Sequence, residues 1–120
     1  MIVKSKKIKL QTKGKEQVVN VTDEVKQAVA EASVKEGLVT VFIYGSTASV
    51  TTIENASYSH EQTWGEDNSN AHLNASLIGP SLTVPIIEGA ITLGTWQQIV
   101  VIDHDNRSRG REVVIQIVGE

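Results

Sequence analysis

Apolar and polar residues alternate with a period of two at 3–10, which is the pattern of a half-buried β-strand. This first strand sets Ile8 and Leu10 among lysines, and Lys13-Gly14-Lys15 predicts a hairpin turn to the second. A near-continuous run of β-branched and aromatic residues at 38–44 predicts a buried central strand. Glu88-Gly89 predicts a further hairpin turn. The expected strands are 3–10, 18–21, 38–44, 48–53, 82–87, 92–103 and 112–118.

One segment follows the helical period instead. Thr22 stands at the expected N-cap, and the acidic Asp23 and Glu24 follow it at the positive end of the helix dipole. Gly37 is the residue expected to end this helix. A second, short helix is expected at 70–77, before a Gly-Pro pair. The apolar positions at helical spacing are Val25, Ala28, Val29 and Ala32.

These elements predict an α+β fold, a two-layer sandwich of mostly antiparallel β-sheet with one long helix and one short helix. The 120 residues are enough for a single domain, 1–120, with one hydrophobic core. Two tryptophans, two tyrosines and one phenylalanine are few for such a core. Valine and isoleucine are therefore expected to fill it.

The charge balance excludes some classes of partner. Eleven basic and fourteen acidic residues give a net charge of −3, so we expect no binding to nucleic acid or to a membrane. The N-terminus lacks an apolar signal core and no apolar run approaches the length of a membrane span, which predicts a cytoplasmic protein. The absence of cysteine excludes disulfides and thiolate zinc sites. Four lysines are expected to protect an edge strand: Lys4, Lys6, Lys7 and Lys9.

Two histidines, His60 and His72, bracket a polar stretch that holds several carboxylates. Two histidines and one carboxylate are enough to hold a divalent metal with open positions for water or substrate. The spacing matches neither a zinc finger nor an HExxH helix. A second interpretation therefore stays open, in which His60 is a surface residue and His72 caps or lines a helix end.

Two other polar elements are candidates for ligand contact. Gly45-Ser46-Thr47 interrupts two strands and can form a small nest of N–H groups for phosphate, or alternatively a glycine bulge with exposed hydroxyls. Gly94-Thr95-Trp96-Gln97 offers a close backbone approach, an aromatic wall and an amide to a small polar molecule. Three alternating arginines share one side of an extended segment, where we favour a surface or subunit role over anion binding: Arg107, Arg109 and Arg111.

Motifs are spread over nearly the whole chain, and the most specific is the stretch 81–101, SLTVPIIEGAITLGTWQQIVV. The others include Asn20-Val21-Thr22, Gly45-Ser46-Thr47-Ala48, Trp64-Gly65-Glu66-Asp67-Asn68, Ala71-His72-Leu73, Leu77-Ile78-Gly79-Pro80-Ser81 and Asp105-Asn106-Arg107. In these motifs the chain resembles the YjbQ-like proteins, also called secondary thiamine-phosphate synthases.

The resemblance implies an α/β sandwich assembled as a homotrimer, with pockets near the subunit boundaries. It also implies a weak thiamine-phosphate synthase, which transfers a hydroxymethylpyrimidine group from its pyrophosphate to a thiazole phosphate with metal assistance. A divalent metal, zinc or magnesium, is expected on His60 and His72. The expected catalytic residues are Glu54, Asp67 and His72, and the expected substrate-binding residues are Ser46, Thr47, Asn68, Thr95, Trp96 and Gln97.

Two departures from the family pattern bear on activity. Many members carry a histidine where this chain has Ser46. Typical members also have a longer segment after Glu54, of which only Asn55-Ala56-Ser57 remains here. These departures favour an alternative function, a non-catalytic trimeric protein that binds a small molecule or anion in a degenerate site. The partner expected under the transferase function is a small phosphorylated metabolite.

Overall fold

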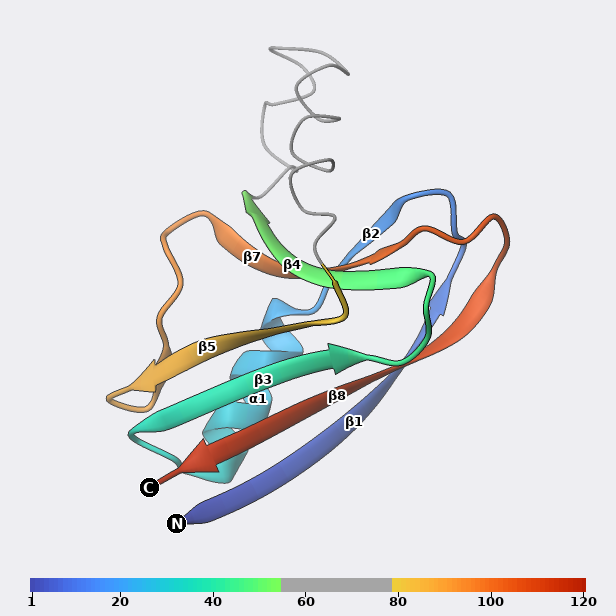
Figure 1. Cartoon of the computed structure of the whole chain (residues 1–120). Helices are drawn as coiled ribbons and strands as arrows, with labels where there is room; N and C mark the ends of the chain where they lie inside the picture. Colours follow the sequence, from blue (N-terminus) through green and yellow to red (C-terminus); the bar gives the residue numbers. More distant parts are fainter. Residues whose placement is uncertain (55–78) are drawn as a thin grey trace.

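Two antiparallel sheets and one helix make up the fold (Figure 1), in a computed structural model that describes residues 1–54 and 79–120. The larger sheet has the strand order β1-β8-β3-β5-β6, and the smaller sheet has the order β2-β7-β4. The antiparallel α+β class expected from the sequence is confirmed. The elements are β1 (Ile2–Thr12), β2 (Gln17–Asn20), α1 (Thr22–Ala32), β3 (Gly37–Ile43), β4 (Ala48–Glu54), β5 (Ser81–Ile87), β6 (Ala90–Ile91), β7 (Gln97–Asp103) and β8 (Arg109–Gly119).

Helix α1 lies against one face of the larger sheet (Figure 1) and spans 11 residues. That is an average length for a globular protein, so the expectation of a long helix is wrong. The buried side chains are those at helical spacing, as predicted. The short helix expected at 70–77 lies outside the described residues. No helix in the described part of the chain is long and apolar enough to cross a membrane.

Both predicted ends of α1 differ from the structure. Thr22 is the first helical residue rather than the N-cap, because its hydroxyl accepts the Ile99 N–H at 2.9 Å and so serves β7. Asn20 instead accepts the Thr22 N–H at 2.9 Å. At the other end the chain leaves the helix at Ser33, which has a left-handed φ of 55°. The helix is therefore closed four residues before Gly37.

Gly37 has a different role, since it starts β3 where this strand meets β8. A Cβ atom at this position would lie 2.1 Å from the Val118 carbonyl oxygen, well inside van der Waals contact. The glycine is thus required by the close approach of two strands and not by the end of the helix.

The predicted hairpin between the first two strands is also wrong. β1 pairs with β8 in the larger sheet, whereas β2 pairs with β7 in the smaller one. The connection between them carries the chain from one sheet to the other, through the left-handed Lys15 and Glu16, with φ of 56° and 64°. The lysine-rich β1 does lie at the edge of its sheet, as expected.

The Glu88-Gly89 turn is confirmed, since it joins β5 to β6 with both φ angles positive and pairs Ile87 with Ala90. The strand expected at 92–103 is shorter than predicted. Residues 92–96 leave the sheet, and β7 begins only at Gln97. This irregular stretch leads to the end of the smaller sheet where Glu54 pairs with Gln97.

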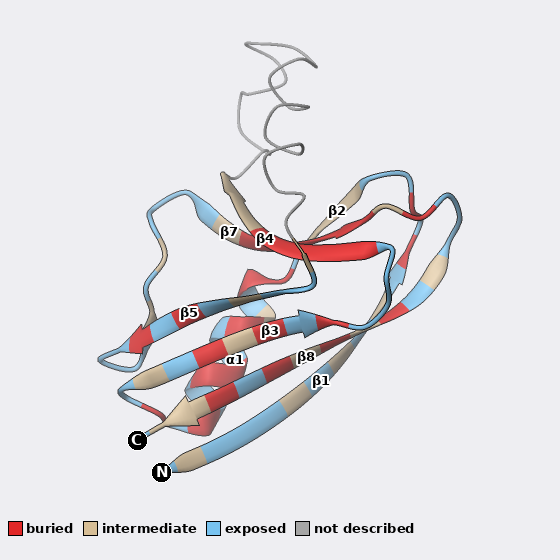
Figure 2. Ribbon diagram, in the orientation of Figure 1, coloured by how far each residue is buried: buried red, intermediate tan, exposed pale blue. Residues whose placement is uncertain are grey.

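Valine and isoleucine fill the core, as the composition predicted, and they supply all of the largest fully buried side chains. In β3, Val39, Val41 and Ile43 face the core between the larger sheet and α1. Leu38 and Phe42 alternate with them and are 51% and 38% exposed (Figure 2). This strand is therefore central in the sheet but buried on one face only.

Candidate functional site

The predicted site residues that the structure describes fall at the two ends of β4. Ser46 and Thr47 immediately precede this strand, and Glu54 ends it opposite Gln97. A strand of seven residues spans about 20 Å, so one small ligand cannot contact both groups. Thr95 and Trp96 lie with Gln97 at the Glu54 end. The other predicted site residues, His60, Asp67, Asn68 and His72, lie outside the described residues.

At the first end, the side chains of Thr12, Thr47, Asp103, Asp105 and Arg111 form a hydrogen-bonded cluster that we call the crossover corner. Its centre is a two-pronged ion pair in which Arg111 donates from Nε to Asp103 Oδ2 and from Nη2 to Asp103 Oδ1, each at 2.9 Å. The two side chains are only 6% and 0% exposed. The surface or subunit role favoured for Arg111 is therefore wrong.

The remaining lone pairs of Asp103 are also used, since the Thr12 hydroxyl donates to Oδ2 and the Asp105 N–H donates to Oδ1. A carboxylate that accepts so many hydrogen bonds is stabilised in its charged form. The Arg111 guanidinium thus holds the pKa of Asp103 well below its usual range. The same hydrogen bond raises the pKa of Arg111.

Thr47 joins this cluster from the β3–β4 connection. Its hydroxyl accepts from Arg111 Nη2 at 2.6 Å and donates to Asp105 Oδ2 at 2.9 Å. Burial raises the pKa of Asp105, but hydrogen bonds from Thr47 and Arg109 outweigh this effect, so the pKa lies below its ordinary value. The Thr47 hydroxyl is thus already engaged by protein groups. The phosphate-binding role of Ser46 and Thr47 stays a prediction.

At the other end of β4 lies an open groove of about 320 Å³, which we call the β4–β5 groove. The Gln97 side chain links two parts of the groove wall. Its Nε2 donates to Thr52 Oγ1 at 3.0 Å, and its Oε1 accepts the Gly94 N–H at 3.0 Å. The indole of Trp96 is 57% exposed beside it. The described residues that line the groove are Thr51, Thr52, Leu82, Thr83, Val84, Pro85, Thr92, Leu93 and Gln97.

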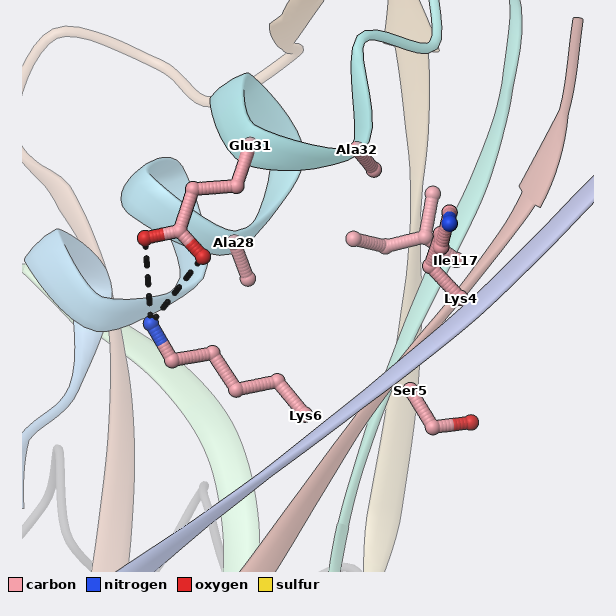
Figure 3. Close-up of a pocket in the computed structure, with 7 residues that line it drawn as sticks. All are labelled: Lys4, Ser5, Lys6, Ala28, Glu31, Ala32 and Ile117. Atoms are coloured by element: carbon pink, nitrogen blue, oxygen red, sulfur yellow. Dashed lines mark hydrogen bonds and ion pairs between the residues drawn. The ribbon is translucent and has the colours of Figure 1, made fainter.

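A second groove, of about 330 Å³, lies between β1 and α1 (Figure 3). Ala28 and Ile117 contribute apolar walls from the helix and the sheet, and Lys6 reaches across to Glu31 at 3.4 Å. This ion pair is largely solvated, so it contributes little to stability. None of the residues predicted for the site lines this second groove.

Several residues of this geometry were missed by the sequence analysis, above all Thr83, Thr92 and the engaged Asp103. Their roles depend on strand pairing, and only the alternation of polar residues in strands could have marked them. Within residues 1–54 and 79–120, no three histidine or acidic side chains gather closely enough to hold a metal. The zinc or magnesium site on His60 and His72 stays a prediction, since both residues lie outside the described part.

Comparison with known proteins identifies relatives along the whole chain. A family described as "UPF0047 protein YjbQ-like" matches residues 6–62 and 54–120. A UPF0047 protein of Methanocaldococcus jannaschii is 33% identical over 130 residues, covering 95% of this chain and 94% of the relative. An X-ray structure from C. acetobutylicum is similar, with a TM-score of 0.77 and 34% identity over 96% of this chain and 99% of that one. A YbjQ-like protein of unknown function from Sulfolobus solfataricus P2 has a TM-score of 0.73 and 26% identity, over 98% and 99%.

These matches overturn the expected thiamine-phosphate synthase activity. The relatives from M. jannaschii and Synechocystis are described only as UPF0047 proteins. The Sulfolobus structure is that of a protein of unknown function. Similarity to them therefore brings no transferase activity to this chain.

The crossover corner makes a prediction about stability. Asp103→Asn removes the carboxylate that pairs with the buried Arg111 guanidinium and leaves Asp105 Oδ2, 3.9 Å from Nη2, as its remaining counter-charge. We therefore expect the free energy of unfolding at pH 7 to fall by about 2–4 kcal/mol. The pKa of Asp103 is lower in the folded chain, so its contribution is present above the ordinary value of about 4 and is lost as the pH falls below it. The difference between the two proteins should therefore narrow toward pH 2.

Urea unfolding followed by circular dichroism, repeated between pH 7 and pH 2, measures this difference. Glu112→Gln is the matched control, because the Glu112 carboxylate lies 3.6 Å from Lys7 Nζ in a solvated pair. We expect the control to change stability by no more than about 0.5 kcal/mol. A cost for Asp103→Asn as small as that of the control, or one that does not vary with pH, contradicts the assignment.

Proposed function

The chain is a member of the YjbQ-like UPF0047 family, and from the geometry of its β4–β5 groove we propose that it binds a small, uncharged polar molecule there. The observation that carries the proposal is the lining, which combines four threonines and one glutamine with aliphatic residues. The volume, about 320 Å³, is at the lower end of the range of ligand sites.

Some polar groups of the groove are held by hydrogen bonds within the protein, and some keep a donor or acceptor that a ligand can use. Hydrogen bonds to Thr52 and Gly94 hold the Gln97 amide in one position. Ligand binding therefore does not cost the conformational entropy of ordering this side chain. The Thr52 hydroxyl accepts this bond and keeps its own proton for a ligand. The Thr83 hydroxyl pairs with the Thr40 hydroxyl at 2.9 Å, and the Thr92 hydroxyl donates to the Pro85 carbonyl oxygen at 3.2 Å. The Thr52 hydroxyl therefore suits a ligand with hydroxyl or amide groups.

The charge of the groove favours a neutral ligand. No lysine, arginine or histidine is found among its described lining residues. Glu54 ends β4 opposite Gln97 and places a carboxylate at this end of the strand. A phosphate would lose hydration without a cation among the described lining residues to replace it. The small phosphorylated metabolite expected from the resemblance stays a prediction, and the described wall favours an uncharged ligand over it.

Ligand-observed NMR with pairs of neutral and phosphorylated compounds tests the proposal. We expect cytidine or ribose to show saturation transfer from the protein, with weaker signals from cytidine 5′-monophosphate and ribose 5-phosphate. The Gln97→Leu variant should lose most of the signal, because the amide that orders the wall is gone. Gln27→Leu, an exposed site on α1 outside this groove, is the matched control. Binding that is unchanged in Gln97→Leu, or confined to phosphorylated compounds, contradicts the proposal.

The outer face of the larger sheet, opposite α1, supports self-association. The pairing registers place Val3, Val118, Leu38 and Pro85 in one row across β1, β8, β3 and β5. Val3 and Leu38 are more than half exposed. An uncovered apolar row of this kind marks an interaction surface. We propose that another copy of the chain covers this face, in the homotrimer that the family resemblance implies.

Sedimentation equilibrium measures the assembly directly. We expect a mass three times the chain mass of 13.0 kDa. Leu38→Lys places a charge in the middle of the apolar row and should shift the protein to the monomer. Ala30→Lys, an exposed position on α1, adds the same charge elsewhere and should leave the mass unchanged. A monomeric wild-type protein, or a Leu38→Lys variant of unchanged mass, contradicts this interface.

A further inference from the structure

Three side chains next to the crossover corner form a hydrogen-bonded chain that neither the family nor the groove accounts for. Ser49 Oγ lies 2.9 Å from His104 Nε2, and His104 Nδ1 lies 2.7 Å from Glu16 Oε2. A hydroxyl, an imidazole and a carboxylate joined in this order have the arrangement of a nucleophile, its base and the group that orients the base. We propose that Ser49 is a nucleophile that accepts the acyl group of a small activated ester, with His104 as its general base.

Backbone hydrogen bonds hold two members of this hydrogen-bonded chain, His104 and Glu16, in place. The His104 N–H donates to the Thr47 carbonyl oxygen at 2.8 Å, which fixes the residue beside β4. The Glu16 N–H donates to the Asp103 carbonyl oxygen at 2.9 Å, which brings the carboxylate to the imidazole. The backbone of His104 is therefore fixed beside the start of β4, and its imidazole contacts the Glu16 carboxylate from the β1–β2 turn.

The turn that carries Glu16 is strained. Lys15 and Glu16 both adopt positive φ angles, of 56° and 64°, which residues with a side chain rarely do. Strain of this kind persists where the surrounding structure imposes it, often at functional sites. Here it has a specific result, since it places the Glu16 carboxylate against His104.

The hydrogen bonds define where the protons are. The Glu16 carboxylate can only accept, so His104 Nδ1 carries the proton of that bond. In the neutral imidazole, Nε2 then has a free lone pair that accepts the Ser49 hydroxyl proton. This is the tautomer that a general base requires. Glu16 is a positioning residue, because it acts on Ser49 only through His104.

The reaction with p-nitrophenyl acetate follows from this arrangement. Ser49 Oγ attacks the carbonyl carbon while its proton passes to His104 Nε2. The bond from the carbonyl carbon to the aryl oxygen then breaks, p-nitrophenolate leaves, and the acetyl group remains on Ser49. His104 Nε2 first releases this proton to solvent. Water then attacks the acetyl ester while one of its protons passes to His104 Nε2. The bond from the carbonyl carbon to the Ser49 oxygen breaks, this oxygen takes the proton back from His104, and acetic acid leaves and ionises to acetate.

The reaction is expected to be slow and to need a good leaving group. Ser49 is only 4% exposed, so a small electrophile is favoured. The Val50 N–H points away from β7, to the Gly79 carbonyl oxygen at 3.0 Å. By the alternation of an antiparallel ladder, the Ser49 N–H points toward β7, where Ile102 stands opposite it. The amide of the nucleophile is therefore used by the sheet and cannot stabilise an oxyanion.

The test is to treat the full chain with p-nitrophenyl acetate and to locate acetyl groups by peptide mass spectrometry over time. We expect Ser49 to be acetylated faster than the exposed Ser108, the internal control, and Ser108→Ala to leave this rate unchanged. His104→Gln should slow acetylation of Ser49 by about 100-fold. Absence of acetyl on Ser49 in the wild-type protein, or an unchanged rate in His104→Gln, overturns the proposal. The result is independent of ligand binding in the β4–β5 groove.

Glu16 is tested separately, because it is half exposed and Glu16→Gln should fold normally. We expect a strongly downfield Nδ1 proton resonance of His104 in the wild-type protein, which Glu16→Gln removes. Acetylation of Ser49 in this variant should slow by about tenfold. A resonance and a rate that both survive in Glu16→Gln show that the carboxylate does not orient the imidazole, which overturns this part of the proposal.

Discussion

The buried ion pair of Asp103 and Arg111 is the interaction on which the arrangement of the two sheets depends. Asp103 ends β7 in the smaller sheet, whereas Arg111 belongs to β8 in the larger one. Thr12, at the end of β1, and Thr47, between β3 and β4, add their hydroxyls to the same two side chains. Three of the connections that carry the chain between the sheets, 13–16, 44–47 and 104–108, therefore meet at this one cluster.

The crossover corner lies at one end of β4, and the β4–β5 groove, which is suited to a ligand, lies at the other. At the crossover corner, the backbone carbonyl oxygens of Asp103 and Asp105 accept the N–H groups of Glu16 and Lys15, respectively. These hydrogen bonds fix the strained turn of the β1–β2 connection. About 20 Å away along β4, the open β4–β5 groove is lined by neutral side chains, including Thr92 and Leu93 from the irregular stretch 92–96. A rigid scaffold with ligand contacts at the ends of its strands is a common arrangement of binding sites.

The sequence predicted the parts of the fold that depend on local patterns. The strands predicted at 38–44 and 112–118, the helical spacing from Val25 and the Glu88-Gly89 turn are all found in the structure. The pairing of strands was predicted poorly, because β1 pairs with β8 about a hundred residues later and no local signal marks that partner. Thr22 and Gly37 were assigned to helix ends for the same reason, since both serve distant strands, β7 and β8.

The candidate site was likewise predicted where it depends on a local motif and missed where it depends on strand pairing. Gln97 was selected from its motif, but its partner Thr52 became visible only through the register of β4 and β7. Ser49, His104 and Glu16 are separated by 55 and 88 residues along the sequence, so no spacing motif could bring them together. Function predicted from resemblance failed for another reason, since the relatives themselves are described without an activity.

A double-mutant cycle between Asp103 and Arg111 tests most directly whether this pair holds the sheets together. Free energies of unfolding would be measured for the wild-type protein, Asp103→Asn, Arg111→Met and the double variant. We expect the double variant to lose less stability than the two single variants combined, with a coupling of about 2 kcal/mol or more. Losses that add within about 0.5 kcal/mol would show that the two side chains act independently, which contradicts the role given to the crossover corner.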